Sequence, residues 1–181
     1  MKTGHFEMQL EDRDDFGHLL SELDLTGYGI ELGVAGGEFS HKILEKSKLK
    51  ILFSVDRWSD HHNDAEYKRA AEILREHGER SVILRLTFDE ALLLFQDEVF
   101  DFIYIDGYAH TGQCEGKTIY DWWPKLKAGG IFAGHDYSAK FPKTIEHVDR
   151  FVAEHNLELH LSQEKQRHRI YPSWFCAKQV I

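Results

Sequence analysis

The stretch IELGVAGGEFS, residues 30–40, decides the fold of this chain. An apolar run passes directly into three glycines within five positions, with Glu31 before the glycines and Glu38 after them. Glycine carries no side chain, so it lets a turn bend sharply and lets a ligand approach the backbone. We interpret the stretch as a strand, a ligand-binding turn and the start of a helix, whose free N–H groups face the ligand.

Strand and helix patterns alternate along the chain from this stretch onward. Apolar runs rich in β-branched residues predict strands at residues 28–33, 50–56, 80–86, 99–106 and 129–136. Apolar residues at helical spacing predict helices at residues 38–47, 64–78, 89–95, 112–127 and 142–156. No helix pattern separates the last two expected strands, which therefore form an antiparallel pair near residues 157–161 and 169–178.

This alternation is typical of βαβ units with right-handed connections. It predicts an α/β protein with a doubly wound, mostly parallel, seven-stranded Rossmann-like sheet, helices on both faces and an antiparallel C-terminal strand. One domain is expected over residues 26–181, after a short N-terminal extension at residues 1–25 that the pattern does not place. Ligands of such sheets bind beyond the carboxyl ends of the strands, where the first βα turn lies.

The charge balance argues against a nucleic-acid partner. The 181 residues include 22 Lys and Arg against 31 Asp and Glu, a net charge of −9, and they contain no dense basic run. Such a protein repels phosphate backbones. We expect a small-molecule substrate and no nucleic acid.

No segment predicts export or membrane insertion. The N-terminus is polar and acidic, unlike a signal peptide, and no apolar run approaches the ~20 residues of a membrane span. Cys114 and Cys176 do not form a disulfide framework or a zinc site. We expect a cytoplasmic protein without a membrane partner.

The glycine turn distinguishes between two cofactor classes. A dinucleotide site needs G-x-G-x-x-G, but Ala35 occupies the place of the second glycine, and Glu31 and Glu38 would repel a diphosphate. The pattern E-x-G-x-x-x-G, from Glu31 through Gly33 to Gly37, resembles the first motif of class I S-adenosylmethionine-dependent methyltransferases. A plain glycine turn is the alternative.

Further candidate cofactor contacts follow the second and third strands. Asp56 ends the second strand, where an acidic residue can accept hydrogen bonds from both ribose hydroxyls of an adenosine; a solvated strand-end aspartate is the alternative. Arg57 and Trp58 come next and could lie over the nucleoside. Thr87 and Phe88 follow the third strand, where methyltransferases of this class usually contact adenine.

Residues 101–137 carry the most specific resemblance. The motifs I-D-G, G-G-I and G-H-D-Y, with His110, Asp121 and Trp123, resemble the macrocin-type O-methyltransferases and their relatives described as cephalosporin hydroxylases. The resemblance extends to PSWFCAK and covers about residues 29–178. It implies a methyltransferase fold and S-adenosylmethionine as the cofactor.

Two aspartates at strand ends predict a metal site. Asp106 and Asp136 end neighbouring strands, which lie ~4.8 Å apart, so one cation is within reach of both. The resemblance implies a divalent ion such as Mg²⁺ there, with His135 where some relatives have glutamate. The alternative is that Asp106, with Gly107, only orients the methionine part of the cofactor.

The expected reaction is methyl transfer to oxygen. The acceptor must lose a proton; His110 is the candidate base, and Asp106 is the second candidate catalytic residue, through the metal. We expect a small-molecule hydroxyl, in a sugar or natural product, as acceptor. An amine acceptor and a non-catalytic cofactor-binding domain are the alternatives. The short extension leaves the acceptor side open, for a large acceptor or for closure by a second subunit in a homo-oligomer.

Overall fold

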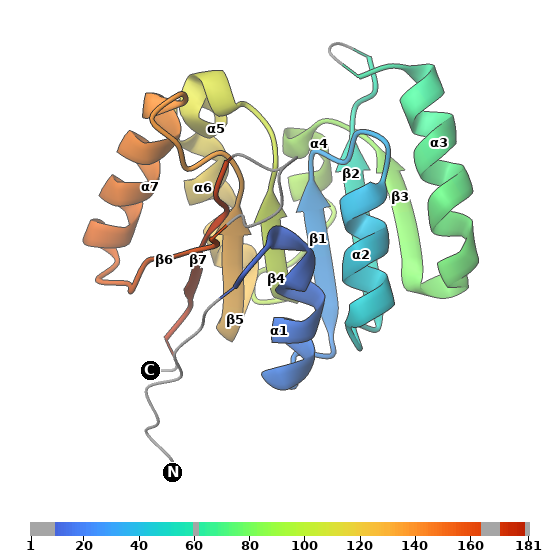
Figure 1. Ribbon diagram of the computed structural model, residues 1–181, viewed down its shortest axis with the longest axis horizontal. Helices are drawn as coiled ribbons and strands as arrows, with labels where there is room; N and C mark the ends of the chain where they lie inside the picture. Colours follow the sequence, from blue (N-terminus) through green and yellow to red (C-terminus); the bar gives the residue numbers. More distant parts are fainter. Residues whose placement is uncertain (1–9, 60–61, 164–170, 180–181) are drawn as a thin grey trace.

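A seven-stranded sheet organises the chain in the computed structural model, which describes residues 10–59, 62–163 and 171–179 (Figure 1). The strands are β1 (Tyr28–Leu32), β2 (Ile51–Asp56), β3 (Ser81–Arg85), β4 (Phe100–Ile105), β5 (Leu126–Gly134), β6 (His160–Leu161) and β7 (Trp174–Ala177). The α-helices are α1 (Phe16–Glu22), α2 (Glu38–Lys46), α3 (Asp64–Leu74), α4 (Phe88–Leu92), α5 (Gly112–Glu115), α6 (Lys117–Trp122) and α7 (Pro142–Glu154). Short 3₁₀ helices are η1 (Arg13–Asp15), η2 (Arg75–Arg80), η3 (Ala109–Thr111) and η4 (Trp123–Lys125).

The strand order is β3-β2-β1-β4-β5-β7-β6. Strands β1 to β5 are parallel, and β7 lies between β5 and β6, antiparallel to both. The predicted Rossmann-like sheet and its antiparallel C-terminal pair are therefore confirmed, although residues 169 and 170 of the last expected strand lie outside the described residues. The order reverses between β1 and β4, so a ligand site is expected at the carboxyl ends of these two strands.

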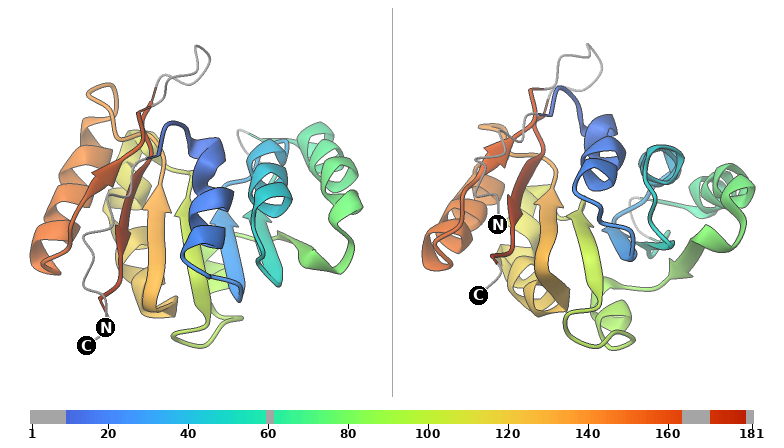
Figure 2. Two further views of the ribbon diagram at one scale, coloured as in Figure 1. Left: turned by 60° about the horizontal axis from the view of Figure 1, so that its bottom comes forward. Right: turned by 90° about the horizontal axis from the view of Figure 1, so that it is seen from below.

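Helices cover both faces of the sheet (Figure 2). Helices α1, α2 and α3 pack on one face, and α4, α6 and α7 pack on the other. Strand β4 shows why both faces are apolar: Phe102 and Tyr104 belong to the first core, whereas Ile103 and Ile105 belong to the second. None of the described helices has the length and apolar character that crossing a membrane requires.

The N-terminal segment that the sequence pattern did not place packs onto the first face. Phe16 in α1 is fully buried, and its ring lies 5.6 Å from that of Phe102, 5.5 Å from that of Tyr104 and 5.5 Å from that of Phe175. This anchor holds the preceding 3₁₀ helix η1 against the sheet, which brings Arg13 to the carboxyl ends of the strands.

The helix expected over residues 112–127 is broken in the structure. Gly116, at φ 83°, separates α5 from α6, and the 3₁₀ helix η4, with Pro124 as its second residue, follows α6. Strand β5 then begins at Leu126, three residues before the expected start, because Leu126 pairs with Phe100 of β4. The apolar pattern alone did not distinguish the early, bulged part of this strand from a helix end.

Candidate active site

Two adjoining pockets lie at the carboxyl ends of the parallel strands, at the edge where β1, β2 and β4 end in Figure 1. Gly33, His62 and Asp106 line both pockets. The first is also lined by Asp56, Arg57, Leu86, Thr87, Phe88, Gly107 and Tyr108. The second is also lined by Arg13, Glu31, Val34, Ala35, Glu38 and Phe39.

The glycines of the opening turn make room for other segments of the backbone. Gly33 has φ 99°, and a Cβ atom built on it would lie 1.9 Å from the backbone oxygen of Asp106. Gly37 has φ 89°, and its Cβ would lie 2.9 Å from the Cα of Ala70. The sequence predicted that these glycines leave room for a ligand. At both positions, the backbone of another segment of the chain takes this room instead.

Asp56 holds this turn through its carboxylate. Its Oδ2 accepts hydrogen bonds from the backbone N–H groups of Val34 (2.9 Å) and Ala35 (3.0 Å), and its Oδ1 accepts one from Trp58 (3.0 Å). A carboxylate has about four acceptor sites, so one site on Oδ1 is left for a ligand. Asp56 can therefore accept one ribose hydroxyl, whereas the sequence interpretation assigned it both.

Trp58 stabilises the glycine turn by a hydrogen bond and lines neither pocket. It is 1% exposed, its Nε1–H donates to the backbone oxygen of Ala35 (2.8 Å), and its ring packs edge-on against Tyr67. Ala35, at φ 49°, directs this oxygen toward the indole. Of the two residues expected over the nucleoside, Arg57 is the one that lines the first pocket.

Aromatic rings form one wall of the first pocket. The ring centroids of Phe88 and Tyr108 lie 5.1 Å apart, and Tyr108 is 47% exposed. A Cβ on Gly107 would lie 3.1 Å from the Phe88 ring, a tight contact that would push the ring by a few tenths of an ångström. Thr87 caps α4 by accepting a hydrogen bond from the Glu90 N–H. An apolar, partly open slot of this kind suits a flat heterocycle.

Glu31 is the buried acid of the second pocket, 1% exposed. The Ser40 hydroxyl contacts its carboxylate and lies 2.7 Å from the Ser54 hydroxyl. Burial raises the pKa of Glu31 to about 8, although the Ser40 hydrogen bond and the charge of Arg13 lower it in part. Glu31 is therefore mostly protonated at neutral pH.

Arg13 is a site residue that the sequence reasoning missed. Its guanidinium lies 3.0 Å from Asp106 Oδ2 and 4.2 Å from the centre of the Phe39 ring. Its Nε is buried and has no hydrogen-bond partner among the described residues. No motif surrounds Arg13 in the sequence; the only local signal is the amphipathic stretch that follows it, residues 16–23.

The three predicted metal ligands lie together. One ligand atom from each of Asp106, His135 and Asp136 falls within 4.8 Å of the other two. His135 Nδ1 is 2.9 Å from Asp136 Oδ1 and 3.5 Å from Asp106 Oδ1. Asp136 adopts φ 61°, an uncommon conformation that aspartate tolerates. Arg13 occupies the other oxygen of Asp106, so a cation here would meet Oδ1.

His62, and not His110, lines the two pockets. His110, the candidate base, is exposed on η3, with its ring 5.3 Å from that of Phe141, and it lines neither pocket. His62 lines both pockets and pairs with Glu66 at 3.3 Å. The catalytic role of His110 remains a prediction.

Comparisons with known proteins bear on the family and the fold of the chain. A family model described as a methyltransferase domain matches residues 30–137, more than half of the chain. No curated protein gave a significant match.

Solved structures share the fold at low sequence identity. A cofactor-bound protein from MTB has a TM-score of 0.74 at 11% identity, covering 98% of this chain and 84% of its own. An O-methyltransferase from Bacillus cereus, in complex with SAH, has 0.71 at 12%, covering 92% and 80%. An rRNA methylase from Streptococcus thermophilus has 0.65 at 13%, covering 93% and 94%.

Replacing Gly33 tests the backbone contact at the turn. Gly33→Ala should lower the free energy of unfolding by about 1–3 kcal/mol for its positive φ and by about 1–3 kcal/mol more for overpacking against Asp106. Gly78→Ala is the matched control, because Gly78 also has positive φ (56°) but its Cβ would meet no atom within 4 Å. Urea unfolding measures both variants. Equal losses would show that the contact with Asp106 is unimportant.

The raised pKa of Glu31 predicts a pH-dependent stability. The folded-state pKa is about 8, above the ordinary 4.5, so the contribution of Glu31 is fully present below pH 4.5 and is lost as pH rises through 8. Glu31→Gln cannot ionise, so its stability relative to the wild type should increase from pH 5 to pH 9, by up to about 4 kcal/mol. Urea unfolding at both pH values measures this gain, with Glu22→Gln, an exposed site, as control. An unchanged difference would mean that Glu31 ionises normally.

Proposed function

The chain belongs to the methyltransferase-domain family, whose class I members use S-adenosylmethionine, and we propose that it methylates a hydroxyl oxygen of a small molecule. The observation that carries this proposal is the pair of joined pockets. One has a strand-end carboxylate and an aromatic wall, and the other has a buried acid and a partly buried guanidinium. A nucleoside joined to an amino acid has matching groups at its two ends.

The side chains of the two pockets complement the two ends of S-adenosylmethionine. In the first pocket, the free acceptor site of Asp56 would take a ribose hydroxyl, and the slot of Phe88 and Tyr108 would take the adenine. In the second, Glu31 would accept from the ammonium group, and the unpartnered Nε of Arg13 would donate to the carboxylate. An ammonium beside Glu31 favours the ionised acid, so binding would release its proton.

Oxygen in a small molecule is the acceptor that we favour. The relative from Bacillus cereus is an O-methyltransferase, and the motifs of residues 101–137 resemble a subgroup that acts on the hydroxyls of sugars and natural products. The rRNA methylase shows that this fold also serves RNA, but the net charge of −9 opposes an RNA substrate. An amine acceptor is the second candidate.

The chemistry requires that the acceptor lose a proton as the methyl group moves from sulfur to oxygen. We propose that Asp106, His135 and Asp136 hold a divalent ion, which would polarise the acceptor hydroxyl. His110 would remove the proton. It lies two residues after Tyr108, which lines the first pocket.

Calorimetry with S-adenosylhomocysteine tests the cofactor assignment. A micromolar dissociation constant is expected, about −8 kcal/mol. Asp56→Asn should weaken binding about 10- to 100-fold, the loss of one charged hydrogen bond. Asp24→Asn is the control, because Asp24 is exposed.

Turnover on matched hydroxyl and amine compounds then identifies the acceptor atom. Methylation of amines alone would refute O-methylation, and binding without turnover would indicate a non-catalytic domain.

Chelation and two variants distinguish the proposed role of the metal in catalysis from that of the base. Excess EDTA and Asp136→Asn should each reduce turnover at least tenfold while leaving cofactor affinity within about threefold, because Asp56 and the turn hold the cofactor. His110→Ala should lower turnover with metal still bound, and alkaline pH should restore part of it. Elemental analysis and kcat against pH are the measurements. Full activity in EDTA would eliminate the metal, and an unchanged kcat in His110→Ala would eliminate this base.

A further inference from the structure

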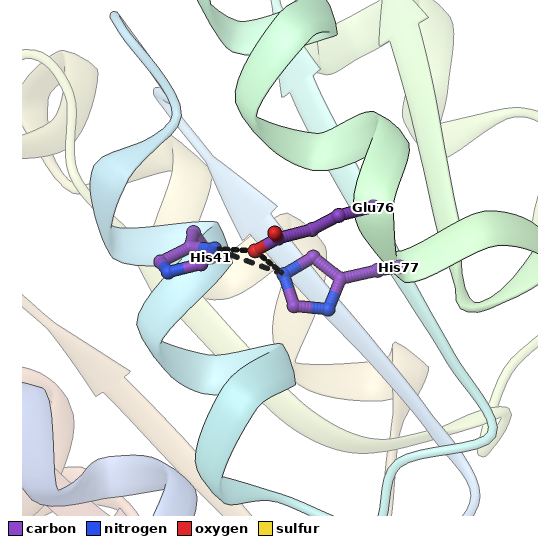
Figure 3. Close-up of side chains that lie close together, drawn as sticks. All are labelled: His41, Glu76 and His77. Carbon is purple, nitrogen blue, oxygen red and sulfur yellow. Dashed lines mark hydrogen bonds and ion pairs between the residues drawn. The ribbon is translucent and has the colours of Figure 1, made fainter.

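A second cluster of potential metal ligands lies outside both pockets (Figure 3). His41 projects from α2, and Glu76 and His77 come from η2, which follows α3. His41 Nδ1 is 2.8 Å from Glu76 Oε1 and 3.0 Å from His77 Nε2, and the latter two atoms are 3.6 Å apart. Three potential ligand atoms therefore surround one small space.

Hydrogen bonds alone satisfy this cluster poorly. His41 Nδ1 takes part in both short contacts. If this nitrogen carries a hydrogen, that hydrogen is shared between Glu76 and His77. If it carries a lone pair, it can accept from His77, but it then faces the carboxylate of Glu76 with no hydrogen between them. A cation at the centre would contact all three lone pairs at once.

The spacing and the donor types match those of zinc. Tetrahedral Zn²⁺ with nitrogen and oxygen ligands at about 2.0–2.2 Å sets its ligand atoms about 3.3 Å apart. The three separations in the cluster, 2.8–3.6 Å, bracket this value. We propose that His41, Glu76 and His77 bind a zinc-class divalent cation, with its fourth position open to water or to another carboxylate.

The surroundings favour a cation. Glu72 and Glu38 line the hollow beside His41 and Glu76; Glu38 pairs with Arg69, and Glu72 adds negative charge. Lys42 also lines this hollow, but its ammonium pairs with Glu45 at 2.9 Å.

The site would connect the glycine turn to the end of α3. The backbone N–H of His41 donates to the backbone oxygen of Gly37 (3.0 Å), so His41 stands one helical turn after the glycine loop. His77 precedes Gly78, whose positive φ turns the chain toward β3. A cation shared by both segments would stabilise the domain without contacting either pocket, which gives it a structural role independent of the proposed reaction.

Zinc binding to the full chain tests the proposal. Calorimetry with Zn²⁺ should show one fewer ion per chain in His77→Gln than in the wild type. The rise in Tm caused by Zn²⁺ should persist in Asp136→Asn, which alters the other cluster, and should be smaller in His77→Gln than in the wild type. His18→Gln is the matched control, because His18 is exposed on α1. Affinity for S-adenosylhomocysteine should stay unchanged in His77→Gln.

A second variant, at an exposed residue, controls for misfolding of His77→Gln. Glu76 is 61% exposed, so Glu76→Gln should fold normally and should bind Zn²⁺ at least tenfold more weakly. Anomalous diffraction at the zinc edge should place an ion between His41 and His77. Equal Zn²⁺ stoichiometry and an equal rise in Tm in the wild type, His77→Gln and Glu76→Gln would overturn the proposal, as would a wild-type protein that binds no zinc at this cluster.

Discussion

The close passage of the turn after β1 over the end of β4 is the constraint on which the site depends. The Gly33 N–H donates to the backbone oxygen of Val55 (2.8 Å), and the Asp106 N–H donates to that of Leu32 (2.7 Å), so the sheet ladder continues into the turn. Gly33 then passes so close to the Asp106 carbonyl that a side chain cannot fit between them. Because Asp106 lines both pockets, this contact determines where the two pockets meet.

Much of the fold and part of the site can be predicted from the pattern of apolar runs in the sequence, for a physical reason. Parallel strands place their carboxyl ends at one edge, so residues that directly follow an apolar run converge whatever lies between them. Asp56, Phe88, Asp106 and Gly107 line the first pocket for this reason. The metal candidates Asp106 and Asp136 meet by the same rule.

Other parts of the site depend on side-chain direction and tertiary packing, which spacing does not encode. Trp58 follows Asp56 closely, but at φ 47° its ring turns into the core, where it bonds to Ala35. Arg13 reaches the second pocket only because Phe16 anchors α1 on the sheet. The cluster of His41 and His77 joins segments far apart in the sequence, through the packing of η2 against α2.

The charges around the second pocket balance one another before any cofactor binds. Arg13 neutralises one oxygen of Asp106, and Glu31 keeps its proton because burial disfavours its charge. The methionine end of the proposed cofactor brings a carboxylate and an ammonium together. Arg13 can pair with the carboxylate through its Nε while its terminal nitrogen stays on Asp106, and Glu31 can ionise beside the ammonium. The pocket would thus lose one proton and gain a zwitterion and a sulfonium, so its net charge would stay the same. Asp106, which lines both pockets, is the carboxylate left near that sulfonium. A divalent ion would bind Asp106 through Oδ1, because Arg13 already pairs with Oδ2, so the metal and the guanidinium can share this carboxylate.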